Sequence, residues 1–209
     1  MDDIRLFDDL FQSFTSNNNL YNTITEISKS GKPHYISAVE DNTKIFAMDE
    51  LSKKIHKYIH KNDDDKNRHS SVDGFYYRKR RDGKLDLLFI EFKVINNINQ
   101  NYRRILKEKI RPSLRLKSLE SLNCILPHLI FQNCSEEISK NLNKLIFDSK
   151  KYYFCVILNP NISETNAQAI INSDYVDIER LSPFPFDKVY LKSPKKFKTF
   201  FTKIVQSSE

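Results

Sequence analysis

Glycine and tryptophan are scarce in this chain, which has three glycines and no tryptophan among its 209 residues. It contains no Gly-x-x-x-x-Gly-Lys phosphate loop and no Gly-x-Gly-x-x-Gly dinucleotide fingerprint. Both motifs need glycines at fixed positions, because the backbone there must approach a phosphate closely. The sequence therefore excludes these two nucleotide-binding motifs, and we expect any coupling to ATP to come from a partner ATPase or helicase subunit.

Cysteines and long apolar runs are scarce as well. Cys124, Cys134 and Cys155 are an odd number without Cys-x-x-Cys spacing, which argues against a zinc ribbon or a disulfide framework. No apolar stretch approaches the roughly 20 residues that a membrane span requires. The start, Met1-Asp2-Asp3-Ile4-Arg5, is acidic where a signal peptide carries positive charge. We expect a cytoplasmic protein with reduced thiols and no membrane partner.

Positive charge is in excess, with a net value of +7. Residues 188–203 carry six lysines and no acid, and residues 100–117 carry a single acid among their basic side chains. Clustered positive charge is typical of surfaces that bind a nucleic-acid backbone, although a solvated Lys-rich surface has the same composition. We predict that nucleic acid, DNA in the first instance, contacts the basic side chains of the second segment: Arg103, Arg104, Lys107, Lys109, Arg111, Arg115 and Lys117.

The apolar pattern predicts a single α/β domain with a mixed central sheet flanked by helices. Residues 152–158 are a continuous apolar run, typical of a strand buried on both faces, and we place it beside a second apolar strand at 87–94. Helical spacing predicts helices over 20–27 and 43–60. The expected division is into N-terminal packing elements outside the core (1–42), a core (43–160) and a C-terminal extension of sheet and helix (161–209).

The most informative stretch is a predicted hairpin of two strands. Its Arg81-Asp82-Gly83 suits a three-residue loop, a type I turn followed by glycine in the left-handed conformation. In that register Asp73 faces Glu91, with Cβ atoms roughly 5 Å apart, and Lys93 shares the face of Glu91. A two-residue Asp-Gly turn would pair Asp73 with Phe92 and turn it away. Apolar matching does not decide between these registers.

The apolar run 87–90 is followed by two charged residues, the carboxylate Glu91 and the ammonium Lys93. Burying such groups costs free energy unless they pair or bind a metal. Mg²⁺ prefers oxygen ligands and is usually held by one or two carboxylates plus a substrate phosphate, where it polarises the phosphoryl oxygen and lowers the pKa of a bound water. A surface ion pair on an edge strand is the simpler interpretation, but the preceding apolar run favours a central strand.

With Asp73 followed by Glu91-Phe92-Lys93, the chain resembles the PD-(D/E)xK nuclease superfamily over roughly residues 43–160. Val72 stands where the family name has proline. The resemblance implies a restriction-endonuclease-like core and an endonuclease that hydrolyses phosphodiester bonds with Mg²⁺ or Mn²⁺. Gly74-Phe75 after the aspartate is similar to nucleases of anti-phage and restriction systems, which implies an effector of such a system.

The resemblance also implies roles for single residues. It places Lys93 beside the attacking water or the transition-state charge. It implies three ligands for the metal ion: Asp73, Glu91 and the Phe92 carbonyl. The superfamily often supplies a further catalytic carboxylate from the helix before the strands, for which Glu50 is the candidate, Glu40 is the alternative, and an ordinary surface glutamate is the simpler interpretation.

Two other functions fit the same residues. A non-catalytic nucleic-acid-binding or assembly subunit would keep the fold while its apparent site is structural, and its aromatic content of 12% would serve base stacking or a protein interface. An RNA-cleaving toxin would use no metal, so its activity would resist EDTA. A homodimer fits the nuclease interpretation, since enzymes that cut both DNA strands often pair their active sites.

Overall fold

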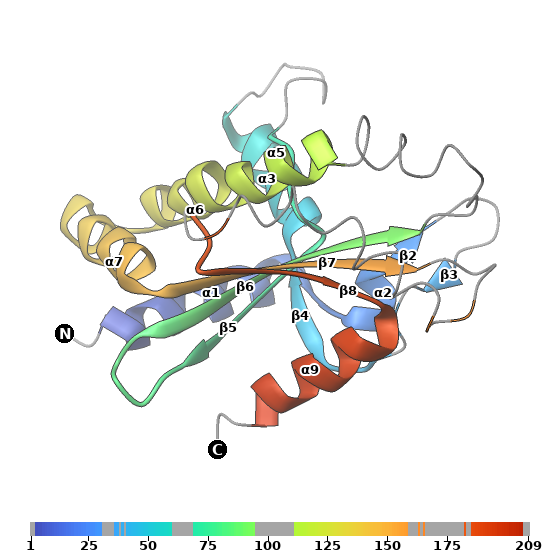
Figure 1. The fold of residues 1–209 in the computed structure, drawn as a ribbon. Helices are drawn as coiled ribbons and strands as arrows, with labels where there is room; N and C mark the ends of the chain where they lie inside the picture. Colours follow the sequence, from blue (N-terminus) through green and yellow to red (C-terminus); the bar gives the residue numbers. More distant parts are fainter. Residues whose placement is uncertain are drawn as a thin grey trace.

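The computed structural model describes residues 3–30, 36–37, 39, 41–59, 69–94, 111–158, 163, 165, 182 and 185–206. Within these ranges the chain forms a six-stranded mixed sheet in the order β1-β4-β5-β6-β7-β8 (Figure 1). Strands β1, β4, β5 and β6 pair antiparallel, and β6, β7 and β8 pair parallel. The α/β class with a mixed sheet is thus confirmed. The strands are β1 (Tyr21–Thr23), β4 (Lys44–Ala47), β5 (Gly74–Lys79), β6 (Leu85–Val94), β7 (Lys150–Leu158) and β8 (Lys188–Lys192), and a separate pair is formed by β2 (Lys29–Ser30) and β3 (Ile36–Ser37).

Helices cover both faces of the sheet. Side chains of one set of helices join the core on one face, and this set comprises α1 (Asp3–Asn18), α3 (Met48–Ile59), α5 (Arg111–Glu120), the π-helical turn η3 (Ser121–Ile125), α6 (Leu126–Asn133) and α7 (Glu136–Asp148). The other face is covered by α2 (Ile24–Ile27) and α9 (Pro194–Gln206). In Figure 1, α5–α7 lie above the sheet and α9 lies below it. No helix within the described ranges is long and apolar enough to cross a membrane.

Strand β6 runs through the middle of the sheet and is buried on both faces. Leu87 and Phe89 join the core beneath α5–α7, whereas Leu88 and Ile90 join the core beneath α9. Because successive side chains of a strand point to opposite faces, Glu91 lies on the α5 side. The residue that carries the predicted chemistry is therefore covered by the helices that follow β6 in sequence.

The hairpin between β5 and β6 has the three-residue loop. The Arg80 amide donates to the Lys84 carbonyl at 2.8 Å, the Gly83 amide donates to the Arg80 carbonyl at 3.2 Å, and Gly83 has a φ of +74°. Phe75 is opposite Phe89. This register confirms one of the two alternatives and puts Asp73, one residue before β5, level with Glu91.

The predicted helix over residues 43–60 is wrong in its first turn. Lys44–Ala47 form β4, in which Phe46 pairs with Phe75 and Ala47 pairs with Gly74. Pairing with the sheet supplies partners for these backbone groups, and the helical spacing of apolar residues begins only at Met48. Helix α3 begins at Met48, directly beside the hairpin.

The N-terminal segment also differs from expectation. Of the predicted helix over 20–27, only Ile24–Ile27 is helical, since the three residues before it pair with β4 as β1. Among the described N-terminal residues, Phe7 and Phe11 of α1 are almost fully buried in the core, and their rings lie 4.6 Å apart. An apolar helix face of this size needs the sheet as its partner.

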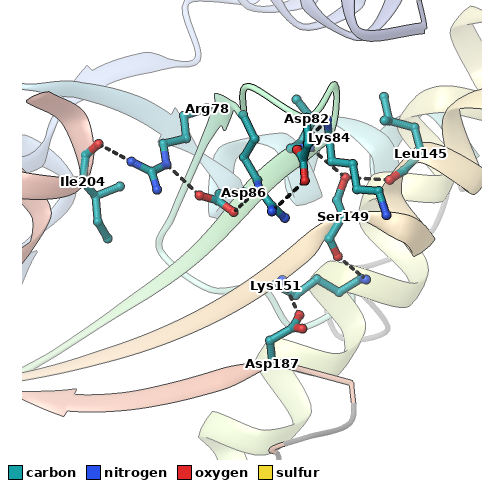
Figure 2. Close-up of polar contacts among 11 residues, drawn as sticks. Arg78, Asp82, Lys84, Asp86, Leu145, Ser149, Lys151, Asp187 and Ile204 are labelled. Carbon is teal, nitrogen blue, oxygen red and sulfur yellow. Dashed lines mark hydrogen bonds and ion pairs between the residues drawn. The ribbon is translucent and has the colours of Figure 1, made fainter. Parts of the chain in front are cut away.

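Polar contacts connect side chains at the hairpin end of the sheet (Figure 2). The buried Asp86 carboxylate accepts a hydrogen bond from Arg78 Nε at 2.7 Å, and Arg78 also donates to the Ile204 carbonyl of α9 at 2.7 Å. Ser149 Oγ donates to the Leu145 carbonyl of α7 at 2.6 Å. The Arg78 contact joins α9 to the sheet at this end, and Asp73 lies at the opposite end, one residue before β5.

Candidate active site

The loop before β5 is held by hydrogen bonds that fix the position of Asp73. The buried Val72 amide donates to Ser121 Oγ of η3 at 2.9 Å, and Ser52 Oγ of α3 donates to the His69 carbonyl at 2.8 Å. The Met48 amide at the start of α3 donates to the Asp73 carbonyl at 3.1 Å. Asp73 is thus anchored from α3 on one side and from the end of α5 on the other.

The Asp73 side chain crosses the end of the hairpin. Its Oδ2 accepts a hydrogen bond from the Phe92 amide of β6 at 2.6 Å, and a quarter of the side chain is exposed. Burial and, after it, the charge of Glu91 raise the pKa of Asp73 to about 7, against the opposing effects of Lys117, the Phe92 amide and Lys93. A carboxyl with this pKa exists in both protonation states near neutral pH.

Glu91 is fully buried and lies between two ammonium groups. Its Oε1 is 2.6 Å from Lys93 Nζ of the same strand and 2.8 Å from Lys117 Nζ of α5. Its Oε2 is buried and has no hydrogen-bond partner among the described residues. A buried carboxylate oxygen without a partner is costly, which makes this atom an available ligand.

Lys117 shows that the two carboxylates share one side of the sheet. Its ammonium, besides contacting Glu91, lies 3.9 Å from Asp73 Oδ1. We refer to Asp73, Glu91, Lys93 and Lys117 as the Glu91 site. The sequence-based prediction gave Lys117 a contact with the nucleic-acid backbone and did not include its contacts with Glu91 and Asp73. One signal could have indicated it, because Lys117 follows the buried Leu114 by three residues and so shares its helix face.

Lys93 remains charged in this environment. Burial opposes the ammonium, but the charge of Glu91 and the hydrogen bond to it raise the pKa of Lys93. Cys155, level with Glu91 on β7, is fully buried, and burial followed by the charge of Glu91 raises its thiol pKa. The thiol is therefore protonated, and the charges at the Glu91 site belong to carboxylates and ammoniums.

Glu50 lies near Asp73 but outside its hydrogen-bond network. Both residues line a cavity of about 400 Å³, together with Asn22, Glu26, Ile27, Lys29, Ala47 and Asp49. Glu50 Oε1 is 2.5 Å from Lys53 Nζ, and half of the Glu50 side chain is exposed. Its role as a further carboxylate stays a prediction, and Glu40 lies outside the described residues.

Of the basic residues predicted to contact nucleic acid, the structure describes only those from Arg111 onward. Arg115 is exposed on α5, which begins at Arg111. The other basic residues of the segment lie outside the described residues: Arg103, Arg104, Lys107 and Lys109. Their contact with nucleic acid remains a prediction.

The donor set fits a divalent cation with few protein ligands. Across the described part of the chain, no group of three or more His, Cys, Asp or Glu side chains is placed to hold a metal ion. Mg²⁺ usually keeps several waters and takes one or two carboxylates plus substrate oxygens. Asp73 and the unpartnered Glu91 Oε2 meet that smaller requirement. A metal ligand role for the Phe92 carbonyl stays a prediction.

Comparison with known proteins gives no assignment. No family model, no curated protein and no solved structure matches this chain.

Proposed function

We propose that this protein is a divalent-metal-dependent endonuclease that hydrolyses phosphodiester bonds, with DNA as its substrate and a restriction-endonuclease-like core. The observation that carries the proposal is Glu91, a fully buried carboxylate beside Asp73 and two lysines, with one oxygen that has no partner among the described residues. Proteins seldom bury a charge in this way without a ligand or a partner for each oxygen.

Asp73 and Glu91 are the residues that would hold the cation. Bound there, Mg²⁺ or Mn²⁺ would polarise a phosphoryl oxygen and lower the pKa of a water molecule. The overall reaction adds that water to phosphorus and breaks one P–O ester bond, which leaves a phosphomonoester and an alcohol. The Phe92 amide orients Asp73 through the 2.6 Å hydrogen bond and so holds one ligand in place.

The two lysines stabilise negative charge. Lys93 and Lys117 each place an ammonium within 2.8 Å of Glu91 Oε1 inside the protein. Cations held close to a reacting phosphate also stabilise the charge that develops on its oxygens in the transition state. Each lysine side chain is about a quarter exposed, so each could contact a substrate phosphate beside Glu91.

The proposal extends to biological context. The segment around Gly74-Phe75 favours an effector of an anti-phage or restriction system, and the absence of a phosphate loop from the sequence favours a separate subunit for any ATP-dependent step. Copurification of the chain from its native host, with the bound proteins identified, tests this context separately from the chemistry.

Cleavage assays test the chemistry. Purified protein is incubated with single-stranded DNA, double-stranded DNA and RNA in Mg²⁺, Mn²⁺ or EDTA. Metal-dependent cleavage of DNA is expected from the parent and should be abolished in Glu91→Gln and Lys93→Ala. The exposed α7 residues Glu137 and Lys144 provide the matched controls Glu137→Gln and Lys144→Ala. If Glu91→Gln and Lys93→Ala cut DNA like the parent and the two controls, the proposal is wrong. Cleavage of RNA that resists EDTA would instead assign the protein to the metal-independent toxins.

One observation favours the non-catalytic alternative. Lys93 and Lys117 carry two positive charges against the two carboxylates, so the Glu91 site is neutral without a metal when all four groups are ionised. Such a set can serve as a structural ion-pair network in a nucleic-acid-binding or assembly subunit. Binding of a divalent cation separates the two functions.

A further inference from the structure

A second concentration of charge lies on the face of the sheet opposite the Glu91 site. A cavity of about 500 Å³ is lined by residues of α9 and the end of β8, and we call it the α9 groove. Among the described residues that line it, none is acidic; they are Thr165, Lys192, Lys195, Lys196, Thr199, Phe200 and Lys203. The chemistry of this lining, ammoniums and hydroxyls around one aromatic ring, suits an anionic ligand.

The ammonium groups of the groove are close enough to disturb one another. Burial and, after it, the charge of Lys196 lower the pKa of Lys192. Lys192 Nζ also lies 5.4 Å from the centroid of the Tyr190 ring, a cation–π contact that holds it at the rim. A bound anion would relieve the repulsion between the two lysines.

The length of the groove favours a polymer over a single phosphate. Lys196 and Lys203 are seven residues apart on α9, which corresponds to roughly 10 Å along the helix axis. A nucleic-acid strand carries one charge per roughly 3.4 Å, so this distance corresponds to about three phosphates. Phe200 lies partly exposed between the two lysines and offers a ring on which a base can stack.

Lys192 of the groove and the residues of the Glu91 site lie near the same end of the sheet. Lys192 is level with Val156 of β7, which is level with Phe92 of β6. Two strand spacings separate Lys192 from Phe92, roughly 10 Å between their backbones. The groove lies on the α9 face and the Glu91 site on the α5 face, so a strand bound at both would have to pass around this end.

We propose that the α9 groove binds the phosphate backbone of a nucleic acid and that the bound strand passes around the end of the sheet to the Glu91 site. The identification of the polyanion as the nucleic-acid substrate rests on the proposed function, but the binding itself needs neither a metal nor cleavage. No described residue of the basic segment at 100–117 lines the groove, and the two would act together.

The salt dependence of DNA binding in EDTA tests this inference. Fluorescence anisotropy with labelled single-stranded and double-stranded DNA of about 30 nucleotides gives the slope of log K against log salt. The triple variant Lys192→Gln/Lys196→Gln/Lys203→Gln should lower that slope by about 2, at roughly 0.7–0.9 per lost phosphate contact, and weaken binding at least tenfold at low salt. The control Lys57→Gln/Lys140→Gln/Lys144→Gln removes the same charge from exposed positions on α3 and α7 and should keep the parent slope.

Three outcomes would overturn the inference: equal slopes for the two triple variants, no DNA binding by the parent, or binding of phosphatidylserine vesicles in place of DNA. If Lys192→Gln prevents folding, judged by circular dichroism, Lys196→Gln/Lys203→Gln against Lys140→Gln/Lys144→Gln repeats the comparison at exposed positions. Failure of the nuclease proposal is seen separately, as intact DNA in Mg²⁺ or Mn²⁺ despite binding that depends on the groove.

Discussion

The ammonium of Lys117 lies 2.8 Å from Glu91 Oε1, although the two residues are 26 positions apart and belong to α5 and β6. Lys93 contacts the same oxygen from within β6 at 2.6 Å. One buried carboxylate therefore binds a cation from a strand and a cation from a helix. This pairing holds α5 on the sheet at the point where the loop that carries Asp73 arrives.

Replacing Lys117 by methionine should weaken both the fold and the proposed activity. Glu91 would keep one of its two ammonium partners, so we expect the free energy of unfolding to fall by about 2 kcal/mol, less than for a carboxylate that loses every partner. Cleavage should fall on the order of a hundredfold, as for other single groups that stabilise transition-state charge. Urea unfolding and DNA cleavage measure the two effects.

The control for this variant is Lys144→Met on the exposed face of α7, which should change neither quantity. The double variant Glu91→Gln/Lys117→Met should recover much of the lost stability, because the buried charge is removed together with its partner. Equal unfolding free energies for Lys117→Met and Lys144→Met would show that the contact with Glu91 contributes nothing.

The raised pKa of Asp73 predicts a pH dependence of stability in the metal-free protein. Its pKa rises from 3.8 to about 7 on folding, so the folded state holds this proton more tightly than the unfolded chain does. Between these values the unfolded chain has lost the proton and the folded protein keeps it. The free energy of unfolding should therefore decline as the pH rises from about 4 to about 7, and level off above that range.

Asp73→Asn should remove this decline. A full shift of this size corresponds to roughly 4 kcal/mol, and the exposed quarter of the side chain reduces that value through solvent screening. Urea unfolding in EDTA at several pH values, followed by circular dichroism, gives the difference between parent and variant. A difference that is constant across the window would mean that Asp73 ionises normally.

Ser121 should affect both stability and cleavage, because it holds the loop that carries Asp73. Ser121→Ala removes the acceptor of the buried Val72 amide, and an unsatisfied buried donor costs about 1–3 kcal/mol. Ser118→Ala, one turn earlier and also buried, keeps that amide paired and serves as the control. Because Asp73 follows Val72 directly, cleavage by Ser121→Ala should fall even at temperatures where the variant is fully folded. Unchanged cleavage by a destabilised Ser121→Ala would separate the loop from the Glu91 site.

The hairpin is the part of the fold that local chemistry predicts best. Arg81-Asp82-Gly83 suits a three-residue loop because Gly83 adopts a positive φ without strain. Apolar matching could not choose the register, since Phe75 would meet a large apolar residue in either one. The observed register is that of the three-residue loop, which the local sequence Arg81-Asp82-Gly83 suits.

Lys117 and β4 show where prediction from local patterns ends. The contact of Lys117 with Glu91 depends on how α5 docks on the sheet, which is a tertiary property. Lys44–Ala47 are a strand because β5 lies beside them, and the helical spacing of apolar residues begins only at Met48. Pattern predicts an element well when its own residues decide its structure, and poorly when a distant partner does.

Binding of Mn²⁺ is the most direct test of the Glu91 site. At Mn²⁺ concentrations about tenfold above Kd, binding to the folded state alone adds about 1.4 kcal/mol and raises the Tm by about 3–6 °C. Asp73→Asn and Glu91→Gln should each lose this rise, because each removes one of the two carboxylates, while Glu137→Gln on α7 should keep it. Glu50→Gln decides the third position: a smaller rise would make Glu50 a ligand, and an unchanged rise would make it a surface partner of Lys53. A parent protein whose melting ignores Mn²⁺ and EDTA alike would favour the structural network of Lys93 and Lys117 over a metal site.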